Sequence, residues 1–152
     1  AKFRKQFTPA VLEKADPANG RLIFQRTCMA CHPLFGEGIP VGPDLTGSDR
    51  RNLDYVLENI LDPNAFVSND YQITTLETKD GRIITGMIKS ETPNALTVQV
   101  LNQEVVVPIP EIKKRTLSPL SMMPDGLAAT MTTEQFRDLV RYLSSDRQIP
   151  LK

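Results

Sequence analysis

Helical periodicity of apolar residues is clearest in two stretches of the chain. Across residues 51–61, apolar side chains recur three and four positions apart, which predicts a helix that Asp62-Pro63 should end. The second stretch begins at Thr132, which forms a capping-box pattern with Gln135 and predicts a last helix. The apolar positions are Leu53, Val56, Leu57, Ile60 and Leu61 in the first stretch, and Phe136, Leu139, Val140 and Leu143 in the second.

A third helix is predicted nearer the start of the chain. Asp16 followed by Pro17 has the form of an N-cap with proline in the first turn, and the helix should continue to Thr27. Residues 1–15 are expected to form an N-terminal arm or linker. Prolines and glycines interrupt residues 33–47 so often that this stretch is predicted to be a loop without regular structure.

From about residue 70 the pattern changes from helical to β. Threonine, valine and isoleucine become frequent, and turn residues separate the predicted strands, which indicates an antiparallel meander or small barrel. The predicted strands are Tyr71–Thr78, Arg82–Lys89, Leu96–Leu101 and Glu104–Ile109. The expected fold is therefore mainly α: a helical domain over 16–152, interrupted by a β-rich insert at about 70–117, and α+β overall.

Composition excludes some classes of function. The 152 residues are 40% hydrophobic, enough for a core, and their formal net charge of zero argues against a nucleic-acid binder. No stretch approaches the roughly 18 apolar residues that a membrane span needs. The polar opening of the chain does not have the pattern of a signal peptide, so we expect a mature form or an excised domain.

Cysteine and histidine occur at one place only. Cys28, Cys31 and His32, the two cysteines and the single histidine of the chain, lie within five residues. Cys-x-x-Cys-His is the attachment signature of c-type haem. Each thiol adds across one haem vinyl group to form a thioether, and the histidine becomes a ligand of the iron. The motif predicts one covalently bound haem c with His32 as its proximal ligand.

Other interpretations of the motif fit less well. A structural zinc site uses about four nitrogen or sulfur ligands, and the chain offers three. A thioredoxin-like redox pair is expected in a βαβ context, whereas a helix is predicted before this motif. A chance match is the remaining alternative, because the motif fixes only a few positions.

A methionine is the natural candidate for the opposite side of the iron, since the chain has no second histidine. Met29 lies inside the attachment motif and cannot reach the opposite face. Met87, in a predicted strand, and Met131, beside the last helix, are better explained as packing residues. Met122 and Met123 lie in a loop rich in proline and glycine. We favour Met123, directly before a proline, and Met122 stays an alternative.

Several motifs together resemble class I cytochromes c. More narrowly, the chain is similar to the haem-binding domain of Planctomycetes and Verrucomicrobia, which is often fused to sugar-dehydrogenase-like propeller domains. The resemblance covers residues 16–146. It is carried by Gly20-x-x-x-Phe24-x-x-x-Cys28-x-x-Cys31-His32, Gly42-Pro43-Asp44-Leu45-x-Gly47, Ser121-Met122-Met123-Pro124-Asp125-Gly126-Leu127 and Leu139-Val140-x-Tyr142-Leu143.

The resemblance implies roles for individual residues and a cytochrome c-like helical haem domain. The carbonyl of Pro43 would accept a hydrogen bond from Nδ1–H of His32, which orients the ring and strengthens it as a ligand. Gly20 and Phe24 would face Tyr142 where the first and last helices of the domain cross.

The same resemblance supports Met123 as the second iron ligand, by its position before Pro124. Arg50 and Arg51 are candidates for binding a haem propionate, although exposed arginines are rarely so specific. The interval between His32 and the methionine is long for a compact cytochrome c, and the β-rich stretch accounts for it. Its pattern is weakly similar to small Sm-like or SH3-like barrels, without the basic stripe or aromatic platform of an RNA-binding surface.

The expected function is one-electron transfer by a monohaem cytochrome, not enzymatic catalysis. His/Met ligation leaves no vacant position for a substrate. The expected partners are redox proteins: a dehydrogenase as donor, and an oxidase or another cytochrome as acceptor. Haem attachment of this kind predicts a periplasmic or otherwise extracytoplasmic location. Two alternatives are a haem sensor or peroxidase-like enzyme with a displaceable methionine, and a docking module that binds a partner through the β-rich insert.

Overall fold

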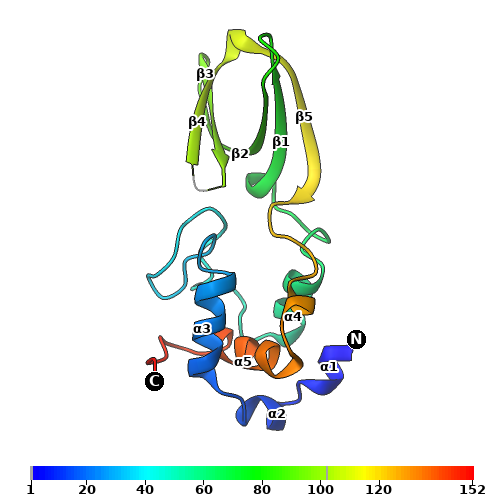
Figure 1. The fold of residues 1–152 in the computed structure, drawn as a ribbon, viewed down its shortest axis with the longest axis vertical. Coiled ribbons are helices and arrows are strands. Elements are labelled where there is room, and N and C mark those ends of the chain that lie inside the picture. The colour runs from blue at the N-terminus through cyan, green and yellow to red at the C-terminus, as the bar shows by residue number, and fades with distance from the viewer. Residues whose placement is uncertain (1, 102) are drawn as a thin grey trace. The chain divides into compact units, whose positions relative to one another are not determined.

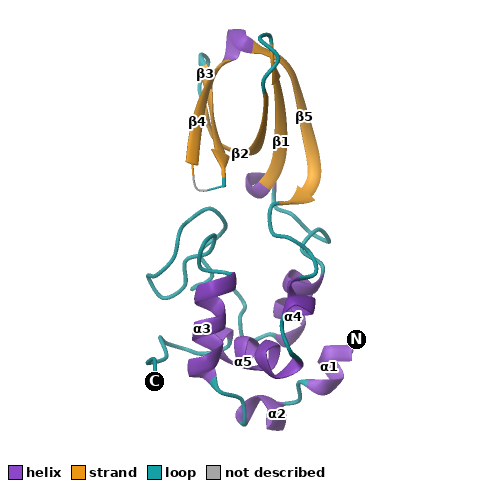
Figure 2. Ribbon diagram, viewed as in Figure 1, coloured by secondary structure: helices purple, strands orange, loops and turns teal. Residues whose placement is uncertain are grey.

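The computed structural model describes residues 2–101 and 103–152, and the chain divides into two compact units (Figure 1). The first, which we call the helical unit, combines Ala1–Ala65 with Asp125–Lys152. The second, the sheet unit, is the continuous segment Phe66–Pro124. Figure 2 shows that helices dominate the first unit and strands the second. Among the described residues, no helix combines the length and the apolar character that crossing a membrane requires.

The predicted mainly α class is wrong. The chain is 34% helical and 27% strand, and its strands form one five-stranded antiparallel sheet. The last strand, Ile112–Ser121, was not predicted, because three consecutive cations and a proline interrupt its apolar pattern. Charged residues and proline are typical of a strand at the edge of a sheet, where one side is not paired.

Capping side chains begin the main helices of the helical unit. Asp16 accepts hydrogen bonds from the backbone N–H groups of Ala18 and Asn19, and Thr132 forms the predicted capping box with Gln135. The elements are α1 (Lys2–Gln6), α2 (Pro9–Glu13), α3 (Pro17–Thr27), α4 (Leu53–Leu61), η3 (Leu127–Thr130) and α5 (Thr133–Leu143). The predicted helices over 16–27 and 51–61 and the predicted last helix are thus confirmed as α3, α4 and α5.

The N-terminal residues differ from the expected arm or linker, because they form α1 and α2 and contribute to the core. Phe7 is only 1% exposed. Its ring packs against those of Phe3 and Phe136, with centroids 5.4 and 5.5 Å away. Helices of five residues are too short to show amphipathic periodicity. Aromatic packing of Phe3 and Phe7 holds α1, and the side chain of Thr8 caps α2.

Helices α3 and α5 cross at Gly20, as the resemblance implies. A Cβ atom on Gly20 would lie 2.0 Å from the backbone oxygen of Asp138 and 2.7 Å from Cβ of Tyr142. The Tyr142 ring packs against Phe24, with centroids 5.6 Å apart. The buried carboxylate of Asp138 also accepts from the backbone N–H of Asp16, 3.0 Å away, which joins α5 to the start of α3. This crossing joins the N-terminal and C-terminal segments of the helical unit.

The sheet unit contains all five strands, in the spatial order β4-β3-β2-β1-β5, each antiparallel to its neighbours. The first four form the predicted meander, and β5 returns to pair with β1. Four buried aliphatic residues form the core: Leu76, Leu96, Val98 and Val107. The elements are η1 (Asn69–Tyr71), β1 (Gln72–Thr78), β2 (Ile83–Glu91), β3 (Ala95–Val100), β4 (Gln103–Pro108), η2 (Ile109–Glu111) and β5 (Ile112–Ser121).

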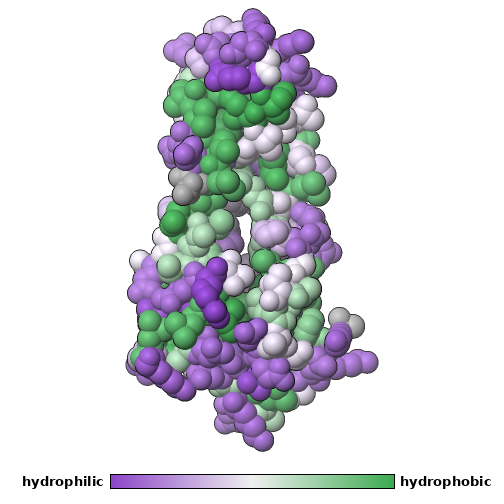
Figure 3. Space-filling model, viewed as in Figure 1, coloured by the Kyte–Doolittle hydropathy of each residue, from purple (hydrophilic) through white to green (hydrophobic). Residues whose placement is uncertain are grey.

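The sheet unit also keeps apolar residues at its surface. Ile83, Val106 and Leu117 are each more than 60% exposed. In the view of Figure 3, hydrophobic residues gather over the strands, and hydrophilic residues cover the end of the sheet unit where η2 lies. The sheet therefore has a buried aliphatic core and a partly apolar exterior.

Candidate functional site

The predicted attachment residues lie on one turn at the end of α3. Cys28 is the C-cap of this helix, and its backbone N–H donates to the carbonyl of Phe24. The carbonyl of Cys28 in turn accepts from the N–H groups of Cys31 and His32, at 3.1 and 2.9 Å. Because one tight turn carries both sulfurs and the imidazole, the helix end positions all three groups together.

The loop over residues 33–47 is irregular, as predicted, but backbone hydrogen bonds fix its path. The N–H of Leu45 donates to the carbonyl of Pro33 at 2.9 Å, and the N–H of Gly42 donates to the carbonyl of Cys31 at 2.6 Å. Leu34 is completely buried and Val41 is 3% exposed. The loop therefore folds back on the turn that carries the cysteines.

The imidazole of His32 is oriented by this loop. Its Nδ1 lies 2.9 Å from the carbonyl oxygen of Pro43, the contact that the resemblance implies. A carbonyl can only accept, so Nδ1 donates, and in the neutral ring this leaves the lone pair on Nε2 for a metal. A Cβ atom on Gly42 would lie 2.7 Å from Cε1 of the ring, so the backbone here approaches the imidazole as closely as glycine permits.

The two thiols are not joined in a disulfide. Burial, with a smaller contribution from the neighbouring Cys31, raises the pKa of Cys28 to about 12, so this sulfur is a protonated thiol at neutral pH. Cys31 is exposed. Two free thiols and an imidazole whose Nδ1 donates to the backbone, all on one turn, fit a group that is attached through two thioethers and one nitrogen ligand.

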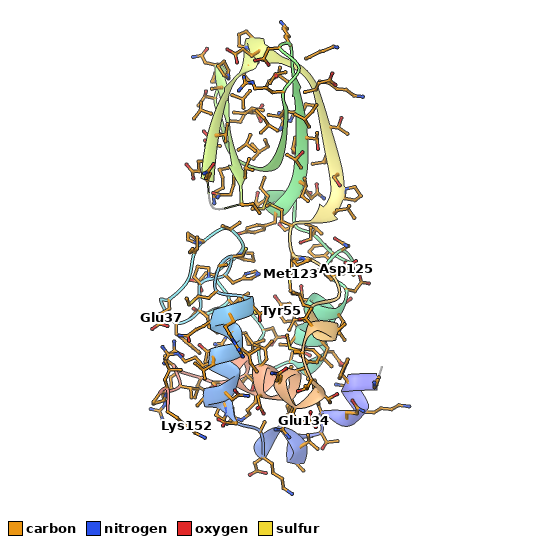
Figure 4. All side chains as sticks on the ribbon, in the orientation of Figure 1. Glu37, Tyr55, Met123, Asp125, Glu134 and Lys152 are labelled. Atoms are coloured by element: carbon orange, nitrogen blue, oxygen red, sulfur yellow. The ribbon has the colours of Figure 1, made fainter. Side chains whose placement is uncertain are left out.

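The predicted methionine ligand belongs to the other unit. Met123 follows β5, and its N–H donates to Oγ of Ser121 at 3.1 Å. The sheet unit ends one residue later, at Pro124. Figure 4 labels Met123 and Asp125, the residues on either side of this boundary. Met123 as iron ligand, with Met122 as the alternative, stays a prediction from the sequence.

Sequence reasoning missed the side chains that hold the loop. Arg21 forms an ion pair with Glu37 at 3.0 Å and donates to the carbonyl of Ile149 at 2.7 Å. Glu37, labelled in Figure 4, lies in the loop. Arg21 and Glu37 both belong to the helical unit. Arg50, considered above as a propionate partner, donates to backbone carbonyls. No local pattern marks these contacts, because their partners lie far apart in the sequence or are backbone atoms.

The comparison with protein families agrees with this geometry. The family model described as cytochrome c matches residues 17–146, from the first residue of α3 to just beyond the end of α5. A search of curated proteins found no match to the chain. Because the match covers most of the chain and includes the Cys-x-x-Cys-His turn, the chain belongs to the cytochrome c family, whose members carry covalently bound haem c and transport electrons.

Proposed function

We propose that this protein is a one-electron carrier in which Cys28, Cys31 and His32 hold a single haem c and Met123 is the second iron ligand. The observation that carries the proposal is the geometry of His32. Its Nδ1–H donates to the carbonyl of Pro43, so Nε2 is the ring nitrogen that can bind a metal, and both thiols lie on the same turn. The bound iron supplies the redox chemistry, which the protein's ligands tune.

Each residue has a distinct part in this proposal. Cys28 and Cys31 form the thioethers, and His32 binds the iron through Nε2. Pro43 keeps the ring in one orientation and strengthens its donation, as such outer hydrogen bonds do in metal sites. A thioether from Met123 favours the reduced state relative to a second imidazole and leaves no position for a substrate. The protein therefore acts as an electron carrier rather than as an enzyme.

The partners and location are also proposals. Redox proteins are the partners that the family implies. The resemblance to the Planctomycete and Verrucomicrobium type supports a dehydrogenase as donor and an oxidase or cytochrome as acceptor. Attachment through two thioethers supports a periplasmic or other extracytoplasmic location.

The test is the absorption spectrum of the protein matured with the c-type haem assembly machinery, combined with a pyridine haemochrome assay. We expect a c-type spectrum with two thioethers and a weak sulfur-to-iron charge-transfer band. Met123→Ala should abolish this band, and the neighbouring Met122→Ala is the matched control that should retain it. Cys28→Ala should leave one thioether.

Three outcomes contradict parts of the proposal. Loss of the band in Met122→Ala alone would assign the ligand to Met122. A covalent haem that lacks the band and binds carbon monoxide under mild conditions favours a sensor or peroxidase-like enzyme. Absence of covalent haem from the wild-type protein rejects the proposed site.

A further inference from the structure

The guanidinium of Arg50 holds the loop that orients His32. Its Nε donates to the carbonyl of Leu45 at 2.9 Å, and its Nη2 donates to the carbonyl of Thr46 at 3.1 Å. The guanidinium also lies 4.9 Å from the centre of the Phe35 ring, in cation–π contact. Arg50 thus contacts the loop on both sides of Pro43 in the sequence: at Phe35 before it, and at Leu45 and Thr46 after it.

The same guanidinium holds the C-terminal end of α5. Its Nη1 donates to the carbonyls of Leu143 and Ser145, the latter at 2.7 Å. Carbonyls at a helix end lack partners within the helix, and a positive charge there is favoured by the helix dipole. Four of the five N–H donors of an arginine are therefore engaged with backbone oxygens from two separate segments.

Short contacts connect the loop carbonyls to the histidine. Leu45, held by Arg50, donates its N–H to the carbonyl of Pro33, the residue directly after His32. Pro43, two residues before Leu45, accepts the Nδ1–H of His32. Thr46 accepts the backbone N–H of Phe35 at its Oγ1, 2.9 Å away. A shift of this segment would therefore move the acceptor of the histidine proton.

We propose that Arg50 is a positioning residue for the axial histidine: it ties residues 43–46 to the end of α5 and so keeps the Pro43 carbonyl on Nδ1–H of His32. This inference rests on the proposed function, in which His32 binds the iron. Four of the five donors of Arg50 are engaged in this way, and a bond from this residue to a haem propionate stays a prediction from the sequence. Only arginine offers a planar fork that reaches four carbonyls, so lysine cannot replace it.

The test compares Arg50→Lys with Arg147→Lys in the reduced holoprotein. Arg147 is an exposed arginine two residues beyond Ser145, and its replacement controls for the general effect of changing arginine to lysine in this region. The readout is the solvent exchange rate of the Nδ1 proton of His32, followed by ¹⁵N NMR. The amides of α3 and α5 report global opening in the same samples.

Arg50→Lys should accelerate exchange of the Nδ1 proton by about tenfold, since the loss of one net hydrogen bond changes a local opening equilibrium by this factor. Exchange of the helix amides should change much less, and Arg147→Lys should match the wild type. Equal acceleration of the Nδ1 proton and the helix amides would assign Arg50 to general stability and overturn the proposal. Unchanged exchange of the Nδ1 proton would also overturn it.

A milder variant covers the case in which Arg50→Lys does not mature. Phe35→Leu removes the ring beside the guanidinium and should accelerate Nδ1 exchange in the same direction, by a smaller factor. Absence of this acceleration would overturn the proposal. Failure of the proposed function is seen separately, in the wild-type NMR spectrum. If the wild-type His32 is not bound to iron, the proposed function and the inference based on it are both rejected.

Discussion

The two units of the molecule achieve stability in different ways. The helical unit joins both ends of the chain, and its core includes the rings of Phe7, Phe24, Phe136 and Tyr142. The sheet unit is one continuous segment with a core of leucine and valine. Joining distant segments carries an entropic cost of loop closure, so the helical unit depends on a few close long-range contacts. The predicted haem residues Cys28, Cys31 and His32 lie in the helical unit, whose folding carries this larger entropic cost.

The largest expected effect is a loss of stability in the sheet unit alone, when a residue of its core is truncated. Leu96 is completely buried, so Leu96→Ala should destabilise the sheet unit by about 3 kcal/mol. Amide hydrogen exchange should report the loss in β1–β4, while two thioethers still form at Cys28 and Cys31. Leu117→Ala, which alters a leucine that is 63% exposed, is the control and should have little effect. Loss of covalent haem in Leu96→Ala would show that the units do not fold independently.

The second prediction concerns a substitution that lowers the stability of the helical unit, at the crossing of α3 and α5. A Cβ at Gly20 meets backbone atoms of Asp138, which cannot move aside as a flexible side chain can. We expect Gly20→Ala to cost about 2–3 kcal/mol in denaturant unfolding followed through the haem absorbance. Gly47→Ala is the matched control, because a Cβ there has no neighbour within 4 Å. Equal stability of the two variants would contradict the close helix crossing.

The smallest effect is the response of each unit to acid. The hydrogen bond from Lys152 is the main cause that lowers the pKa of Asp16, and backbone N–H groups of α3 add to it. A lowered folded-state pKa gives stability that is present above the unfolded pKa and is lost as pH falls through the folded value, here below about pH 4. Asn also caps helices well, so Asp16→Asn should cost only a few tenths of a kcal/mol at pH 7.

Titration of stability measures this effect. Asp16→Asn should flatten the acid limb of unfolding in the helical unit and leave that of the sheet unit unchanged. Asp80→Asn is the counterpart in the sheet unit, where hydrogen bonds from Thr78 and then Arg82 lower the carboxyl pKa. An unchanged acid limb in Asp16→Asn would show that other carboxylates dominate the acid unfolding of the helical unit.

The parts of the fold that the sequence predicted are those with local signals. Helices α3, α4 and α5 were found through their caps and apolar spacing, and β1–β4 through β-branched residues and turns. Strand β5 was missed because pairing with β1, rather than its own pattern, makes it a strand. Helix α1 was missed because the long-range contacts of Phe3 and Phe7 with Phe136 order its segment. Helix α2 was missed because it is only five residues long, although Thr8 caps its start.

The same distinction applies to the site. The Cys-x-x-Cys-His motif is local and could be read directly, and the resemblance supplied the contact between His32 and Pro43 that the structure contains. The four carbonyls that hold Arg50 could not be predicted, since two of them belong to the end of α5 and a backbone oxygen has no signature in the sequence. The second iron ligand, Met123, stays a prediction that the spectra of its variants will test.

The interruption of the helical unit by the sheet unit also determines the order in which its parts are synthesised. At roughly 5–20 residues per second, the turn of Cys28, Cys31 and His32 is complete roughly 6–20 seconds before α5. During this interval α3 has no partner at Gly20, while the continuous sheet segment can already fold. Closure of the helical unit around Cys28, Cys31 and His32 must therefore wait until α5 is present, whereas the sheet unit needs no later segment.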